Sequence, residues 1–208
     1  MKSALKILPS ALANQSDIVV TLATTKHLSY VNQIIELIAL SAKERGTGRG
    51  KRTVSEISQK IRAGQAVIAI SDTGKLAGFC YVAGYDNGAY FANSALVVAH
   101  EFRGCGLSRD IKIEAYRLGK KLFPNATPIT ITTSAAVMKL NQELGYKAVS
   151  FADITSDEQF WEGCKGCVNY DILQRTNRKN CLCTAMKGEA TPTAEVVTLS
   201  KPSYYKEI

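Results

Sequence analysis

The residues with the clearest capacity for chemistry are two glycines in residues 101–108, which read EFRGCGLS. This stretch follows an apolar run that ends at Val98, and it precedes a segment with apolar residues at helical spacing. The predicted order is strand, glycine turn, helix. The first amides of a helix have no partner within it, its dipole adds positive charge there, and glycines let a ligand approach. The pattern predicts an anion site, and a pyrophosphate fits it best.

The glycine spacing separates several kinds of phosphate loop. The P-loop pattern is absent, and a dinucleotide fingerprint would need a glycine where Arg109 stands. The pattern Arg-Gly-x-Gly-x-Gly/Ala, with Ser108 in place of the final small residue, resembles the coenzyme A loop of GNAT superfamily N-acetyltransferases. This resemblance implies acetyl-CoA as the acyl donor. It also implies that the donor is bound by Val97, Val98, Arg103, Gly104, Cys105, Gly106, Leu107 and Ser108.

The elements around this loop are predicted from periodicity and turn signals. A capping box at Thr53-Val54-Ser55-Glu56 opens a helix, and a turn at 72–75 joins two strands of a hairpin. Over 18–151 the predicted order is β-α-α-β-β-β-α-β-α-β, which is that of the GNAT core. The segment 140–146 (LNQELGY) resembles the family's Leu-Tyr-x-x-x-Gly-Phe. The resemblance therefore implies an α/β (α+β) GNAT fold with a mixed central sheet flanked by helices.

The predicted domain organisation has four parts. Residues 1–16 form a loosely ordered leader, in which Lys6 and Pro9 interrupt what would otherwise resemble a signal peptide. The acyl-CoA-binding core is expected over 17–152, a cysteine-bearing extension over 153–190, and a tail over 191–208. These predictions favour a cytoplasmic protein.

Composition limits the classes of partner. The chain of 208 residues is 46% hydrophobic and has no apolar stretch of transmembrane length, so no membrane association is expected. Its net charge of +8 suits a polyanionic ligand such as CoA. Nucleic acid is not favoured, because the basic residues are scattered and aromatic residues make up only 8%. The sequence leaves the oligomeric state, monomer or homodimer, open.

Acetyl transfer to an amine requires a neutral amine, a donor to the carbonyl oxygen, and a proton for the leaving thiolate. The resemblance assigns the carbonyl donor to a backbone amide at Val98. The strand that often carries a catalytic carboxylate in relatives has none in 90–94. His100 is then a candidate base by its natural pKa, or a loop histidine at the family's usual proline position. Asn141, a candidate catalytic residue, stands where relatives often have a tyrosine, and an amide cannot supply a proton.

The resemblance implies an acceptor site between the first two helices. Arg45 and Arg49, with Arg52, could hold a carboxylate there, or they could belong to a solvated basic loop. Asn93 is a further candidate contact to the acceptor. Cys105 could form an acyl-cysteine, but that route needs a base and a lowered pKa, so direct transfer in a ternary complex is favoured.

Four clustered cysteines follow the core. Their spacing, Cys-x-x-Cys then Cys-x-Cys, allows a tetrahedral zinc site or four reduced, partly buried thiols. These residues are Cys164, Cys167, Cys181 and Cys183.

Residues 160–184, taken with the basic loop, resemble a bacterial GNAT subgroup associated with arginine biosynthesis. That resemblance implies a small-molecule amine acceptor, an amino acid such as glutamate. The alternatives are a protein N-acetyltransferase and a non-catalytic acyl-CoA sensor.

Overall fold

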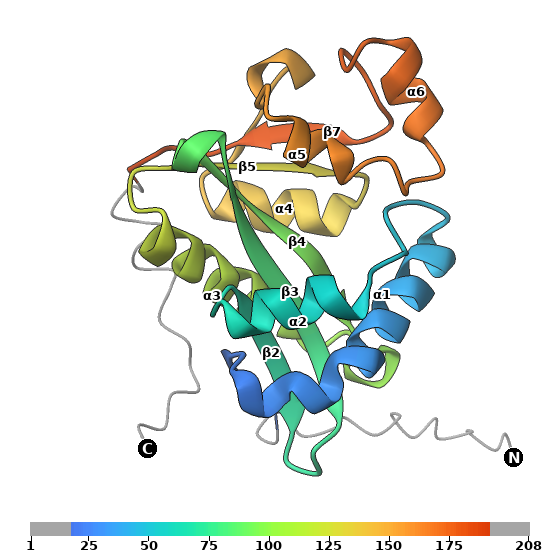
Figure 1. The fold of residues 1–208 in the computed structure, drawn as a ribbon, viewed down its shortest axis with the longest axis vertical. Coiled ribbons are helices and arrows are strands. Elements are labelled where there is room, and N and C mark those ends of the chain that lie inside the picture. Colours follow the sequence, from blue (N-terminus) through green and yellow to red (C-terminus); the bar gives the residue numbers. More distant parts are fainter. Residues whose placement is uncertain (1–17, 192–208) are drawn as a thin grey trace, which may run out of the picture.

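The computed structural model describes residues 18–191 of the chain, so the predicted leader 1–16 and residues 192–208 of the predicted tail lie outside it. The described residues form one seven-stranded mixed sheet flanked by helices, which confirms the predicted fold class (Figure 1). Its strands are β1 (Ile18–Leu22), β2 (Ala66–Ser71), β3 (Leu76–Tyr85), β4 (Tyr90–Val98), β5 (Thr127–Thr132), β6 (Lys147–Ala148) and β7 (Thr184–Lys187). Their order in the sheet is β1-β2-β3-β4-β5-β7-β6.

Six α-helices cover the sheet. They are α1 (Val31–Arg45), α2 (Val54–Arg62), α3 (Leu107–Leu122), α4 (Ala135–Glu143), α5 (Glu158–Glu162) and α6 (Tyr170–Arg175) within the described part of the chain. The predicted capping box is present at α2, where the Thr53 side chain accepts from the Glu56 amide and the Glu56 carboxylate accepts from the Thr53 amide. None of the helices in residues 18–191 is long and apolar enough to cross a bilayer.

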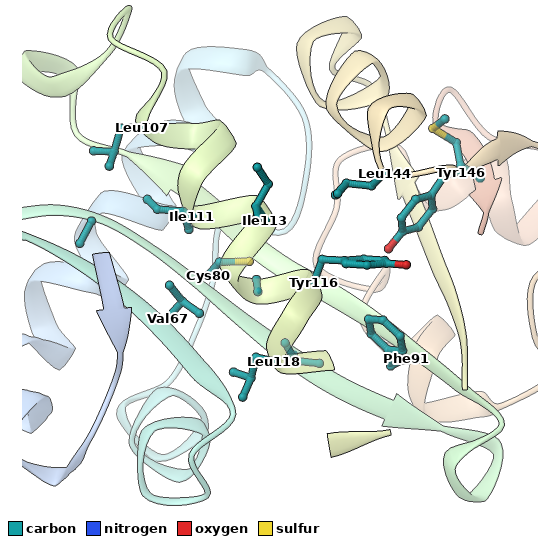
Figure 2. Packing of buried hydrophobic residues seen from close by; sticks show 14 of the residues in the cluster. Val67, Cys80, Phe91, Leu107, Ile111, Ile113, Tyr116, Leu118, Leu144 and Tyr146 are labelled. Carbon is teal, nitrogen blue, oxygen red and sulfur yellow. The ribbon is translucent and has the colours of Figure 1, made fainter. Parts of the chain in front are cut away.

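Alternation along the strands builds a core on each face of the sheet. In β2, Val67 and Ala69 face α3, whereas Ala66 and Ile68 face α1 and α2. Figure 2 shows the α3 side, where Leu107, Ile111, Tyr116 and Leu118 point toward the sheet. Because apolar residues on both faces of the central strands are buried, α3 is fixed firmly against β3 and β4.

The pairing of β4 changes along its length. It runs antiparallel to β3 throughout, but it pairs in parallel with β5 only from Tyr90 to Ala92. Beyond Ala92 the two strands have no shared register. Opposite Cys80 of β3, β4 also contains an extra residue, because Phe79 pairs with Val97 and Tyr81 pairs with Ser94. The backbone between Asn93 and Val98 therefore lies beside β3 without β5 on its other side.

The cysteine-bearing segment contributes a strand to the sheet that the sequence pattern did not indicate. Strand β7 lies between β5 and β6 and pairs antiparallel with both. The strand expected over 147–151 is limited to two residues. Apolar side chains of α5, α6 and β7, including Trp161 and Leu173, form a third core cluster against Ile129 of β5. The segment 153–190 is thus attached to the sheet through β7 and through the buried side chains of this cluster.

The contact between Gly119 of α3 and the Phe91 ring of β4 is tight enough to test. An alanine Cβ at Gly119 would lie well inside contact distance of this fully buried ring. Alanine gains about 1 kcal/mol of helix propensity over glycine, but overpacking costs about 1–3 kcal/mol. Because three ring atoms would lie less than 3 Å from the new Cβ, we expect a cost in the upper part of this range. Gly119→Ala should then lower the free energy of unfolding by about 1–2 kcal/mol, measured by urea denaturation.

The control is Lys121→Ala, at an exposed position of the same helix, which should change stability by less than about 0.5 kcal/mol. A Gly119→Ala protein as stable as the wild type would show that the Phe91 ring can move aside.

Candidate functional site

The glycine loop lies at the start of α3, as the sequence predicted. Gly104 has a φ of 81° and Gly106, the residue before the helix, has a φ of 87°, and both values favour glycine. A Cβ at Gly104 would meet no atom of the described residues within 4 Å, so the space above this residue is open. The 16-residue helix α3 directs its free amides into this space, which suits an anion.

Arg103 is held away from the helix amides by two partners. Its Nε donates to the Val98 carbonyl at 3.1 Å, and its Nη2 lies 2.8 Å from the Glu44 carboxylate of α1. Arg45, which was predicted to bind the acceptor, lies close enough to Arg103 for the two positive charges to interact. Burial lowers the pKa of Arg45, and the charge of Arg103 lowers it further. These two guanidinium groups together give the loop a positive border.

The remaining predicted donor contacts take different positions. Ser108 is exposed in the first turn of α3, whereas Leu107 is buried in the core beneath it. The Cys105 thiol donates to the Phe102 carbonyl at 3.1 Å. Val97 and Val98 pair with β3 through Phe79 and Gly78. The loop and the end of β4 are thus adjacent.

The part of β4 that does not pair with β5 has an irregular backbone, and it leads into the glycine loop. Asn93 is the first residue of β4 beyond the parallel pairing. Two residues later, Ala95 has a φ of 57°, a left-handed conformation that costs a non-glycine residue energy. This bulge interrupts the pairing of β4 with β3 in the part of β4 that does not pair with β5. The sequence assigned that donor role to Val98, and that assignment stays a prediction.

The two predicted proton carriers lie apart. His100 is exposed in the short 3-10 turn between β4 and the glycine loop. Asn141 is fully buried in α4, where its Nδ2 donates to the Met186 sulfur at 3.6 Å. The structure does not bring these two residues together, and their catalytic roles stay predictions.

A basic groove lies between the α1–α2 loop and the segment that contains Glu162 and Lys165. It has a volume of about 1110 Å³, and its lining includes Arg49 and Arg52. Arg49 is paired with Glu56 at 2.7 Å. Arg45 is not among the residues that line the groove, and its Nε donates to the Ser41 carbonyl of α1 at 3.0 Å.

The four clustered cysteines are free, partly buried thiols, and three of them, Cys164, Cys181 and Cys183, pack against the third core cluster. Burial, reinforced by the neighbouring cysteines, raises the pKa of Cys164 to about 11 and that of Cys183 to about 12. Within residues 18–191, no three His, Cys, Asp or Glu side chains are arranged to hold a metal ion. The zinc site that the sequence left open at Cys164, Cys167, Cys181 and Cys183 therefore finds no support.

One buried charged residue was missed by the sequence reasoning. Lys112 of α3 is only 2% exposed, and its Nζ donates to Asn93 Oδ1 at 3.2 Å. Burial lowers its pKa to about 8. The signal was available, because Lys112 lies between Ile111 and Ile113 and one turn before Tyr116, on a helix side with apolar neighbours. One turn earlier, Arg109 is paired at 3.0 Å with Glu143 of α4.

Comparison with known proteins supports the fold. No protein-family model matches the chain, and no curated protein sequence matches it. N-acetylglutamate synthase from Neisseria gonorrhoeae, solved with coenzyme A and N-acetyl-glutamate, is similar in structure, with a TM-score of 0.59 and 11% identity. The match covers 84% of this chain but only 35% of that one.

Two further solved structures match over nearly their whole length. Rv2747 from Mycobacterium tuberculosis, in complex with CoA, has a TM-score of 0.59 and 14% identity over 82% of this chain and 98% of that one. A GNAT superfamily phosphinothricin acetyltransferase from Sinorhizobium meliloti, in complex with AcCoA, has a TM-score of 0.55 and 16% identity over 86% of this chain and 94% of that one. The chain therefore has the fold of the GNAT acetyltransferases.

Proposed function

We propose that this protein is an N-acyltransferase that transfers an acetyl or other short acyl group from acyl-CoA to the amine of a small molecule. The observation that carries the proposal is the open glycine loop at the start of α3, adjacent to the point where β4 leaves β5. Proteins of the same fold have been solved with CoA or AcCoA. The pyrophosphate would lie on the α3 amides, and the acyl arm would enter between the two strands.

The proposed acceptor is an amino acid such as glutamate, in a role in amino-acid metabolism. The groove beside the α1–α2 loop has several cationic side chains, and a guanidinium can hold a carboxylate through two parallel hydrogen bonds. Arg49 and Arg52 also lie close enough to Tyr85 of β3 for their charges to act on its hydroxyl. The groove therefore approaches the sheet, where the acyl group would be presented.

Direct transfer accounts best for the available groups. The acceptor nitrogen attacks the thioester carbonyl, whose oxygen gains charge and would be held by backbone amides of β4. One such donor can lower the barrier by about 3 kcal/mol, and holding both substrates in one cleft contributes more. Cys105 has no adjacent base among the described residues. Its thiol donates to a carbonyl, so an acyl-cysteine route is not favoured.

The first prediction separates ligand binding from backbone strain. Gly104→Val should abolish the stabilisation that acetyl-CoA gives, because its side chain fills the open space above the helix amides. Ligand at a hundred times its dissociation constant stabilises the wild type by about 2.7 kcal/mol, which is roughly 5–10 °C in melting temperature. The measurement is thermal melting with and without acetyl-CoA.

The matched control is Gly64→Val. Gly64 also has a positive φ, 63°, and a Cβ there would meet no atom of the described residues within 4 Å, but it follows α2 and lies outside the loop. Both variants carry the same kind of strain, and only Gly104→Val should lose the response to acetyl-CoA. Equal responses in the two variants would show that the loop is not the CoA site.

The second prediction concerns the acceptor. Arg49→Met should raise the KM for glutamate, or for another carboxylate-bearing amine found in a panel, by tenfold or more. The KM for acetyl-CoA should stay unchanged, because the groove does not include residues of the glycine loop. Release of the CoA thiol measures turnover. Arg62→Met removes the same charge from an exposed position of α2 that does not line the groove, and it should leave this KM unchanged. Acetyl-CoA binding without turnover on any amine would favour the sensor function.

A further inference from the structure

Lys112 is a buried cation that lacks a carboxylate partner in the described part of the chain. None of the ion pairs formed within residues 18–191 includes it, and its hydrogen bond goes to the neutral Asn93 side chain. Its Nζ also lies 5.4 Å from the centre of the Tyr146 ring. A buried ammonium with so little compensation costs free energy, so a role that requires the charge would explain its presence.

Both side chains that contact this ammonium have an unpartnered polar atom. Within the described part of the chain, Asn93 Nδ2 and Tyr146 Oη are buried and make no hydrogen bond, and neither does Asn141 Oδ1 of α4. Asn141 and Tyr146 are almost wholly buried, at 0% and 2% exposure. Figure 2 shows Tyr146 beside Tyr116 on the α3 side of the sheet. Buried polar groups normally have partners, so this group of atoms indicates a site for a polar ligand.

The position of Lys112 suits the reactive end of CoA. It lies six residues after Gly106, which is about 9 Å along the helix axis from the glycine loop. Its amine reaches Asn93, the residue at which β4 leaves β5. A CoA whose pyrophosphate binds the loop would extend its arm along this direction, toward the opening between the strands. The amine is therefore at the inner end of the proposed donor site.

We propose that the Lys112 ammonium contacts the sulfur of bound CoA and protonates the thiolate as it leaves. The inference rests on the proposed acyl-CoA-dependent function. As the bond from the acceptor nitrogen to the carbonyl carbon forms, the C–S bond breaks and its electron pair remains on sulfur. A proton passes from Lys112 Nζ to that sulfur, giving the CoA thiol and a neutral amine. The proton that the acceptor nitrogen loses returns the amine to its charged form through water.

The groups that face Lys112 leave its charge available. On β3 the Cys80 thiol is close, and burial raises its pKa to about 12, so it remains neutral near pH 8. Burial also raises the pKa of both tyrosines, and the Glu143 carboxylate of α4 is paired with Arg109. The charged and titratable groups around Lys112 are thus Cys80, Tyr116, Tyr146, Arg109 and Glu143.

The test compares CoA with desulfo-CoA, which lacks the sulfur. The pKa of the thiol in bound CoA is measured from the ultraviolet absorbance of the thiolate, with the desulfo-CoA complex as the blank. In the wild type this pKa should lie about one pH unit or more below that of free CoA, because an opposite charge favours the anion. In Lys112→Met the lowering should disappear, while desulfo-CoA affinity stays within about twofold of the wild type.

Two further variants make the test specific. Lys121→Met removes the same charge from an exposed position of α3 and should keep the lowered thiol pKa. Asn93→Asp gives the ammonium a carboxylate partner and should abolish the lowering even if Lys112→Met folds poorly. The inference is overturned if the thiol pKa of CoA bound to the wild type equals that of free CoA. It is also overturned if the lowered pKa persists when CoA is bound to Lys112→Met. Failure of the wild type to bind either compound overturns the proposed function and this inference with it.

The titration of Lys112 has a consequence that needs no ligand. Its folded pKa of about 8 lies below the unfolded value of about 10.5, so the unfolded chain binds more protons between these values. Stability from this group therefore rises with pH from about 8 to about 10.5. We expect the melting temperature of the wild type to rise over this range relative to Lys112→Met. A constant difference between the two would show that Lys112 does not titrate there.

Discussion

The parallel pairing of β4 with β5 ends after three residues, and the candidate site depends on where it ends. Two parallel strands in one sheet need a crossover, which here is α3. The crossover places the start of α3 at the end of β4, beside the region where the strands have separated. Ligands of open sheets commonly bind beside the carboxyl ends of strands and at helix N-termini. In the proposed function, the start of α3 holds the pyrophosphate of the donor, and the early separation of β4 from β5 leaves room for its acyl arm.

Local signals in the sequence predicted much of this arrangement. The glycine turn, the capping box at Thr53 and the hairpin turn at 72–75 depend on residues close in the chain, and the structure confirms each as local structure. Strand β7 was missed because its four residues have no periodic pattern long enough to distinguish a strand. Its place between β5 and β6 depends on contacts with residues far away in sequence, which no local pattern specifies.

The functional residues divide in the same way. Gly104 and Gly106 are recognisable because the required φ restricts the choice of residue. Arg45 ends α1 and donates to the Ser41 carbonyl within it, whereas Arg49, in the loop four residues later, pairs with Glu56 of α2, and the sequence alone could not assign these partners. The cysteine spacing suggested a metal, yet in the described residues the thiols lie next to an apolar cluster. Spacing identifies residues that can meet, but packing decides the environment in which they meet.

Lys112 also offers an explanation for the lack of a carboxylate on β4. A carboxylate on β4 would suit a general base, and the side chain nearest the opening is Asn93. An aspartate there would lie against the Lys112 ammonium, and the two would neutralise each other in a medium of low dielectric constant. The amide instead orients the ammonium through Oδ1 without reducing its charge. The proposed reaction needs the Lys112 ammonium to be charged and free to contact the leaving sulfur. Because Asn93 is neutral, it leaves the ammonium free to do so.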